Sequence, residues 1–73
     1  MQTYRTLIVD NNHGSQRELS KILQERDEIT FLGTCSNGME AIETISDKLP
    51  DLIFLEIELP RISGFEVLKN ISE

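Results

Sequence analysis

Three short segments of the chain have the hydrophobic patterns of β-strands. Arg5–Val9 ends in three branched apolar residues and stops at Asp10, which is typical of a buried strand. Ile29–Cys35 alternates less strictly, which favours a strand at the edge of a sheet. Asp51–Ile57 is the most apolar run, interrupted only by Glu56, and it predicts a strand covered on both faces.

Three further segments have helical spacing and polar residues suited to capping their starts. The apolar stripe of the first predicted helix is formed by Leu19, Ile22 and Leu23. That of the second is formed by Met39, Ile42 and Ile45, which we expect to belong to the core. Pro50 ends the second helix. A third helix begins after Ser63 and continues close to the end of the chain. The candidate caps are Asn12 or Ser15, Asn37 with Glu40, and Ser63 with Glu66.

Strands that alternate with helices predict an α/β fold with a doubly wound parallel sheet. Parallel strands are joined by right-handed crossovers, and the more polar second strand belongs outside the other two. The predicted order is therefore 2-1-3. Ligands bind to such sheets beyond the carboxyl ends of the strands, where the strand order reverses. In this chain that point lies between Asp10 and Glu56.

Two acidic residues are thereby predicted to share one small pocket. Neighbouring strands lie about 4.8 Å apart, so Asp10 and Glu56 converge, together with Asn11. Two close carboxylates repel each other or recruit a cation, and a cluster of oxygen ligands favours a hard ion such as Mg²⁺. The alternative is that both are solvated strand ends, although Glu56 interrupts an otherwise apolar strand.

Composition narrows the class of protein. With 73 residues the chain forms one domain, and a chain of this size buries only about 60% of its unfolded surface. Its net charge of −6 argues against direct binding to nucleic acid. No apolar run approaches the roughly 20 residues of a membrane span. There is no secretion signal, and the single cysteine, Cys35, forms no internal disulfide, so we expect a cytoplasmic protein.

Four motifs in the same order give the chain a family resemblance. They are Leu7–Asp10, Asn37–Gly38, Asp51–Pro60 with its proline four positions after Glu56, and Ser63–Glu66. Together they resemble the receiver domain of two-component response regulators, over nearly all 73 residues. The last motif is similar to regulators with a LytTR-type DNA-binding output domain. The resemblance implies a flavodoxin-like sheet of order 2-1-3-4-5. Residues 1–73 are then a partial receiver, from first strand to third helix, without the remaining elements.

The resemblance also implies the roles of individual residues. An acidic pair that holds Mg²⁺ falls on Asp10 and Asn11, the phosphate-accepting aspartate falls on Glu56, and Glu58 contributes a backbone carbonyl to the metal. Asn11 lacks a carboxylate, so Mg²⁺ binding is expected to be weak or absent. Glu56 adds a methylene to the nucleophile, and a misplacement of that scale costs about 10²-fold in rate. We therefore expect a degenerate receiver that is not an enzyme.

The expected partner is a sensor histidine kinase, and two other functions remain open. Without a fourth strand, Leu52–Ile57 lies at an exposed edge through which the chain could self-associate. The first alternative is accordingly a structural dimerisation module without phosphotransfer. The second, a fragment of a haloacid-dehalogenase-like phosphatase using Glu56 and Glu58, has the wrong order of motifs.

Two reactive residue types have ordinary structural interpretations. His13 follows the acidic loop and is expected to be an exposed residue at a helix start rather than a metal ligand. Cys35 lies at the end of a strand without a nearby basic cluster, so we expect a small buried residue.

Overall fold

Six elements alternate along the chain as the hydrophobic pattern predicts. The computed structural model describes residues 2–71. The elements are β1 (Tyr4–Val9), α1 (His13–Gln24), β2 (Ile29–Cys35), α2 (Gly38–Lys48), β3 (Leu52–Leu55) and α3 (Gly64–Ile71).

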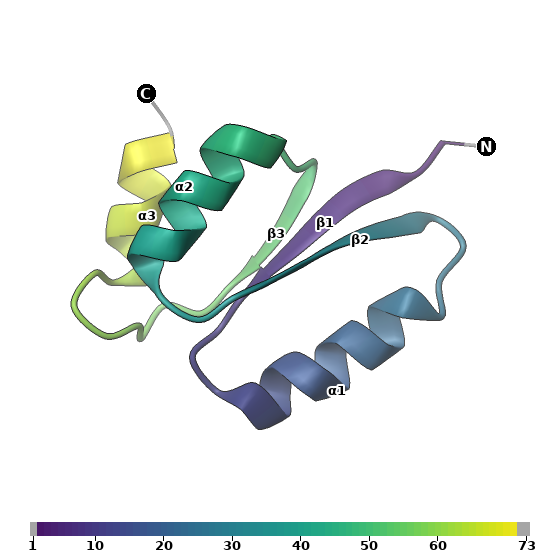
Figure 1. The fold of residues 1–73 in the computed structure, drawn as a ribbon, viewed down its shortest axis with the longest axis horizontal. Helices are drawn as coiled ribbons and strands as arrows, with labels where there is room; N and C mark the ends of the chain where they lie inside the picture. The colour runs from purple at the N-terminus through teal and green to yellow at the C-terminus, as the bar shows by residue number, and fades with distance from the viewer. Residues whose placement is uncertain (1, 72–73) are drawn as a thin grey trace.

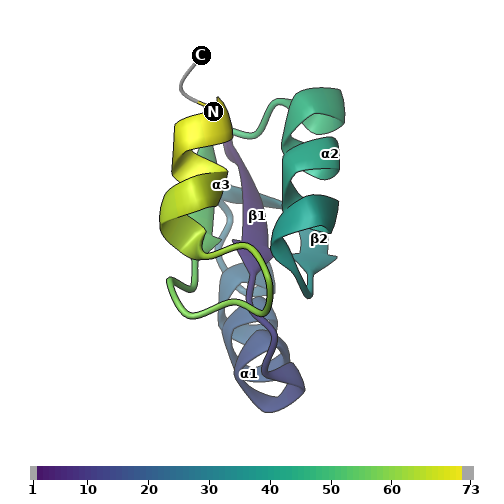
Figure 2. The same ribbon diagram turned by 90° about the vertical axis from the view of Figure 1, so that its left-hand side faces the viewer.

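The three strands form one parallel sheet of order β2-β1-β3, which confirms the predicted topology. Helices α2 and α3 lie on one side of the sheet and α1 lies on the other (Figure 1). Figure 2 shows α3 on the β3 side of the layer and α2 on the β2 side. The chain is therefore doubly wound, and its strand order reverses beside β1. Within residues 2–71 no helix has both the length and the hydrophobicity needed to cross a bilayer.

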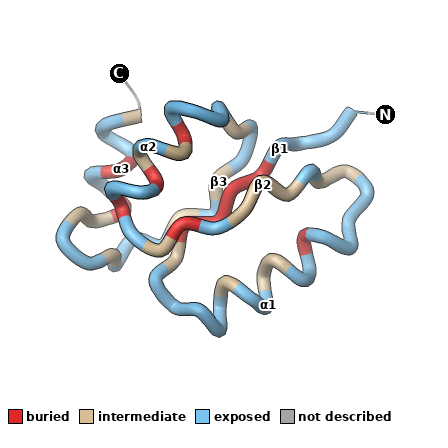
Figure 3. The backbone as a smooth tube through the Cα atoms, in the orientation of Figure 1, coloured by how far each residue is buried: buried red, intermediate tan, exposed pale blue. Residues whose placement is uncertain are grey.

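The main core lies between the sheet and the pair α2 and α3. Its buried residues come from β1, β2, α2 and α3 (Figure 3). They are Leu7, Val9, Cys35, Ala41, Ile45 and Val67. On the opposite face of β1, Thr6 and Ile8 are also buried, beside Leu23 of α1. Strand β1 is thus covered on both faces, as expected for the central strand.

All three predicted helix caps are present. Asn12 Oδ1 accepts the Ser15 backbone N–H at 2.8 Å, which settles the choice between the two candidates. The other two caps are Asn37 Oδ1 accepting the Glu40 N–H at 2.9 Å and Ser63 Oγ accepting the Glu66 N–H at 3.3 Å.

The two outer strands differ in regularity. The pairing of β1 with β2 shifts between Thr6 and Leu7, which pair with Phe31 and Gly33, so Leu32 forms a bulge. Gly33 has φ +134°, which glycine tolerates because it has no Cβ. No such shift interrupts the pairing of β3 with β1. The bulged edge is therefore the less suitable one for pairing with a further strand.

Two predictions about burial are wrong. Strand β3 is not covered on both faces, because Leu52 and Phe54 are 41% and 42% exposed. Helix α1 covers mainly β2 and leaves that face of β3 open. Met39 is not a core residue and is 55% exposed, because the inward face of α2 is formed by Gly38, Ala41 and Ile45. At 100° per residue, Met39 lies about 130° around the helix from the middle of that face.

A close backbone contact fixes the loop between β3 and α3. Gly64 N–H donates to Ile57 O at 2.8 Å. A Cβ at Gly64 would lie only 2.6 Å from Glu56 O, so a larger residue does not fit without moving the loop. This contact explains why a glycine stands eight positions after Glu56 in the chain.

Candidate functional site: an acidic cavity beside β1 and β3

The carboxyl ends of β1 and β3 form a cavity of about 280 Å³. Val9 pairs with Leu55, so the next residue of each segment, Asp10 and Glu56, reaches the same edge of the sheet. The Glu56 N–H donates to Val9 O at 2.9 Å, which continues the pairing to the site itself. The lining residues are Ile8, Val9, Asp10, Leu19, Phe54, Leu55 and Glu56. Both acidic residues thus border one partly apolar cavity at the reversal of strand order.

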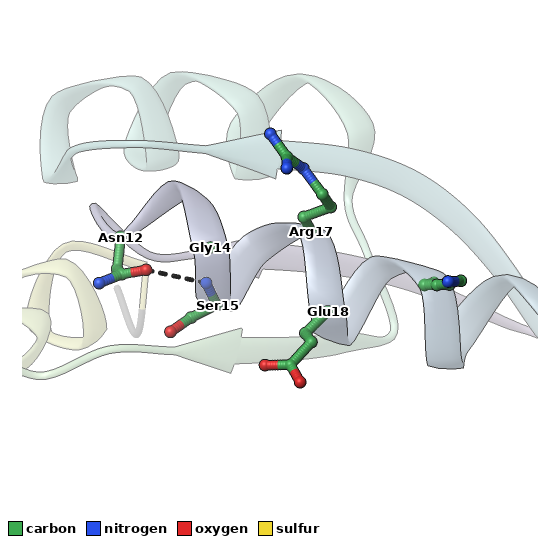
Figure 4. Close-up of a pocket in the computed structure, with 6 residues that line it drawn as sticks. Asn12, Gly14, Ser15, Arg17 and Glu18 are labelled. Carbon is green, nitrogen blue, oxygen red and sulfur yellow. Dashed lines mark hydrogen bonds between the residues drawn. The ribbon is translucent and has the colours of Figure 1, made fainter.

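The Asp10 carboxylate is held by the start of α1. Asp10 Oδ1 accepts the Asn12 N–H at 3.0 Å. The Asn12 side chain in turn caps α1 through Ser15, as the dashed line in Figure 4 shows. A single short turn therefore places the aspartate and starts the helix.

The Glu56 carboxylate folds back over its own loop. Its Oε2 atom accepts the backbone N–H of Ile57 at 2.8 Å and that of Glu58 at 3.3 Å. Adjacent backbone amides that point to one spot form a small anion-binding site. In this chain the side chain of Glu56 itself occupies that site.

The other predicted ligands lie outside the cavity. Asn11 follows Asp10 in the turn before α1, where it is exposed, and it is not among the residues that line the cavity. Glu58 is exposed in the loop after β3. Within residues 2–71 no group of three or more histidine, cysteine or acidic side chains is arranged to hold a metal ion.

His13 and Cys35 have the structural settings that the sequence predicts. His13 is the exposed first residue of α1 and borders a shallow hollow that includes Thr34 of β2. Cys35 is 2% exposed in the core, and this burial raises the pKa of its thiol above the ordinary value. Neither residue lines the acidic cavity.

A second hollow, on the outer surface of α1, differs in chemistry. It has a volume of about 420 Å³ and is lined by the helix start and by side chains of both charges. In Figure 4 the Arg17 and Glu18 side chains extend to opposite sides of α1, so the hollow does not concentrate one charge. The acidic cavity is therefore the better candidate for a specific site.

Sequence reasoning missed two residues that shape the sheet edges. Gln16 contacts the carboxyl ends of β1 and β2 through its side-chain amide. At the amino ends of β1 and β3, the backbone carbonyl oxygen of Arg5 accepts the Asp51 N–H at 2.7 Å. The Arg5 guanidinium donates to Leu49 O at 2.9 Å. Gln16 could have been found from its position, because it is a polar residue on the stripe that continues to Leu19 and Leu23.

The donor set suits a hard cation only in part. Asp10 and Glu56 supply carboxylate oxygens, the ligand type that Mg²⁺ prefers. One oxygen of each already accepts backbone N–H groups. Mg²⁺ keeps several waters when few carboxylates are present, so these two residues fit a weakly held ion.

Comparisons with known proteins agree with this fold and place the chain in a family. The sequence pattern of the response regulator receiver domain matches residues 6–73. A response regulatory protein of Shewanella oneidensis is 44% identical over 62 residues, which cover 85% of this chain and 26% of that protein. The transcriptional regulatory protein BtsR of Salmonella typhi is 41% identical over 64 residues, which cover 88% of this chain and 27% of BtsR.

A solved structure gives the same result in three dimensions. The response regulator domain of Thermotoga maritima CheB matches with a TM-score of 0.92 and 31% identity, covering 96% of this chain and 52% of that one. Both findings agree with the doubly wound sheet of order β2-β1-β3 and with the acidic residues at its reversal of strand order. The chain belongs to the response regulator receiver family, and it spans about half of that solved chain and about a quarter of the curated relatives.

Proposed function

We propose that this chain is a receiver module of two-component signalling in which Glu56 takes the place of the phosphate-accepting aspartate and does not accept a phosphoryl group efficiently. The family assignment supports the receiver role. One observation carries the rest: the Glu56 carboxylate accepts the N–H groups of Ile57 and Glu58. A carboxylate held in this way is directed towards its own loop rather than presented as a nucleophile.

The charge of Glu56 supports partial imitation of a phosphorylated state. An ionised carboxylate carries about −1, whereas a phosphoryl group carries about −1.5 to −2 and has three acceptor oxygens. Glu56 places its charge against backbone amides without any donor of phosphate. The module would thus have a fixed output rather than one switched by phosphorylation.

Mg²⁺ is the cation that receivers use, and here its binding is proposed to be weak. Asp10 and Glu56 would hold the ion, with little help from Asn11 or the Glu58 carbonyl, because neither of those residues lines the cavity. When bound, the ion would neutralise charge between the two carboxylates. Leu19 and Phe54 would form the apolar side of that site.

The remaining parts of the proposal follow from family membership. The natural partner is a sensor histidine kinase in the cytoplasm, and residues 1–73 act as the first part of a receiver rather than as an enzyme. Similarity to BtsR is consistent with a LytTR-type output domain elsewhere in a longer protein.

Intact mass measurement after incubation with acetyl phosphate and Mg²⁺ tests this proposal. The native chain is expected to show no stable phosphoryl adduct. The double variant Asn11→Asp with Glu56→Asp restores both carboxylates of the family pattern and is expected to gain an adduct at residue 56. A stable adduct on Glu56 of the native chain would contradict the proposal.

A second candidate function, self-association through β3, is favoured by one observation. Leu52 and Phe54 are each more than 40% exposed, beside a strand edge that pairs only with β1 among the described residues. An open, regular and apolar edge favours pairing with another chain. The structural dimerisation module therefore remains an alternative to phospho-signalling.

A further inference from the structure

The side-chain amide of Gln16 joins the ends of two strands beside the acidic cavity. Its Nε2 atom donates to Asp10 O, and it lies 3.3 Å from Cys35 O and 3.1 Å from Ser36 Oγ. Two of these three partners are carbonyl oxygens, which only accept hydrogen bonds. The amide nitrogen, and not the amide oxygen, must therefore face the strand ends.

This contact completes the support of Asp10. The Asp10 N–H donates to Cys35 O at 3.0 Å, and Asp10 O accepts from Gln16, so both backbone groups of the residue are held. Asn12 holds one oxygen of the side chain. Three hydrogen bonds thus fix Asp10 beside the cavity, and Gln16 is the only one of the three partners that contributes a side chain.

The same amide connects Asp10 to the start of α2. Gln16 contacts Ser36 Oγ, and the Ser36 N–H donates to Glu40 Oε1 at 2.7 Å in the first turn of the helix. The Gln16 side chain is half-buried, so solvent does not easily replace these bonds. A continuous set of hydrogen bonds therefore runs from the acidic cavity to the loop between β2 and α2.

We propose that Gln16 is the positioning residue of the acidic cavity: it fixes Asp10 for cation binding and couples it to the Ser36 loop. The inference rests on the proposed function, because it assigns Asp10 to a Mg²⁺ site. Residues that orient a metal ligand without touching the metal typically change affinity by about 10–100-fold when replaced. Gln16 acts through Asp10 in this way.

Two variants of Gln16 separate its bonds from its shape. Gln16→Met keeps the length of the side chain but removes its N–H donors. Gln16→Glu places carboxylate oxygens, which only accept hydrogen bonds, against the carbonyl oxygens of Asp10 and Cys35. The same replacements at Gln24, exposed at the end of α1, are the matched controls. Hydrogen exchange at the Asn12 amide is followed in the native background. Mg²⁺ affinity is measured by calorimetry in the background that carries Asn11→Asp and Glu56→Asp.

With Gln16→Met we expect Mg²⁺ affinity to fall by about 10-fold and exchange at Asn12 to accelerate, with a larger effect for Gln16→Glu. A purely structural role would instead accelerate exchange throughout β1 and leave the affinity of the folded protein unchanged. Unchanged exchange at Asn12 in Gln16→Met overturns the inference, as does unchanged affinity. If the restored background binds no Mg²⁺, the proposed function is contradicted, and exchange at Asn12 alone then decides the role of Gln16.

Discussion

Glu56 shows how one methylene can redirect a functional group. Its longer side chain lets the carboxylate turn back onto the amides of Ile57 and Glu58. Asp10, with the shorter side chain, bonds instead to the Asn12 amide that leads into α1. Each carboxylate therefore accepts hydrogen bonds from its own loop, and a cation that contacts both residues would bind in the cavity between the two loops.

Cys35 gives a residue-scale prediction about pH. Burial raises the pKa of its thiol, so the folded state binds this proton more tightly than the unfolded state does. The resulting stabilisation is fully present below the unfolded thiol pKa, about 8.5, and is lost as pH rises towards the folded value. Between about pH 8 and 10 we expect the native chain to lose stability more steeply than Cys35→Ala.

Urea unfolding at a series of pH values measures this difference. The comparison is between slopes, since Cys35→Ala also leaves a small cavity and lowers stability at every pH. Parallel slopes for the two proteins would contradict a raised pKa of the Cys35 thiol in the folded state.

At the scale of elements, the loops after β2 and β3 support the site beside helix α1. The loop after β3 returns to the strand end through Gly64, whose backbone touches that of Glu56. The loop after β2 meets the same region, where a Cβ at Gly38 would lie 2.9 Å from the Ile62 Cβ. Two glycines thus let neighbouring loops pack at the carboxyl end of the sheet.

Gly64→Ala is expected to destabilise the chain and to disturb Glu56. The added methyl group would overlap Glu56 O and Ile57 Cα at 2.6 and 2.7 Å, and such overpacking costs about 1–3 kcal/mol. Gly14→Ala is the control, because its methyl group would meet only the Asn12 side chain, at 3.2 Å, within a helix that favours alanine. Thermal unfolding with amide spectra of Ile57 measures both effects. Equal stability of the two variants would contradict this account of the loop.

At the scale of the molecule, the two outer strands of the sheet are protected to different extents against pairing with another chain. The β2 edge carries the bulge at Leu32, whereas β3 is regular and has Leu52 and Phe54 exposed on one face. Helix α3 lies on the other face of β3 (Figure 2). A chain that associates through this sheet should therefore use β3 rather than β2.

Sedimentation over a range of concentrations tests the open edge. We expect the native chain to show concentration-dependent association and Phe54→Lys or Leu52→Lys to reduce it, because a charged edge disfavours pairing. Met39→Lys, at a still more exposed position on α2, should change little. Association that persists in both β3 variants and disappears with Met39→Lys would place the contact on α2 instead.

The fold was largely predictable because each element has a local signature. The apolar runs and the helix caps at Asn12, Asn37 and Ser63 follow from neighbouring residues. The order of the strands follows from their alternation with helices and from the more polar second strand. The exposure of Phe54 was not predictable, since it depends on which part of the sheet α1 covers. The contacts of Gln16 were missed because they join residues that are distant along the chain.

The central claim is that Asp10 and Glu56 share one cavity, and paramagnetic broadening by Mn²⁺ tests it most directly. At low Mn²⁺ concentration the amide signals of Asn12 and Ile57 should broaden together. They should broaden before the amide signals of the acidic turn that includes Asp27 and Glu28, which lies at the amino end of β2. The variant Asp10→Asn should weaken the broadening at both Asn12 and Ile57. Broadening of only one of the two amides, or equal broadening at all acidic turns, would contradict a shared site.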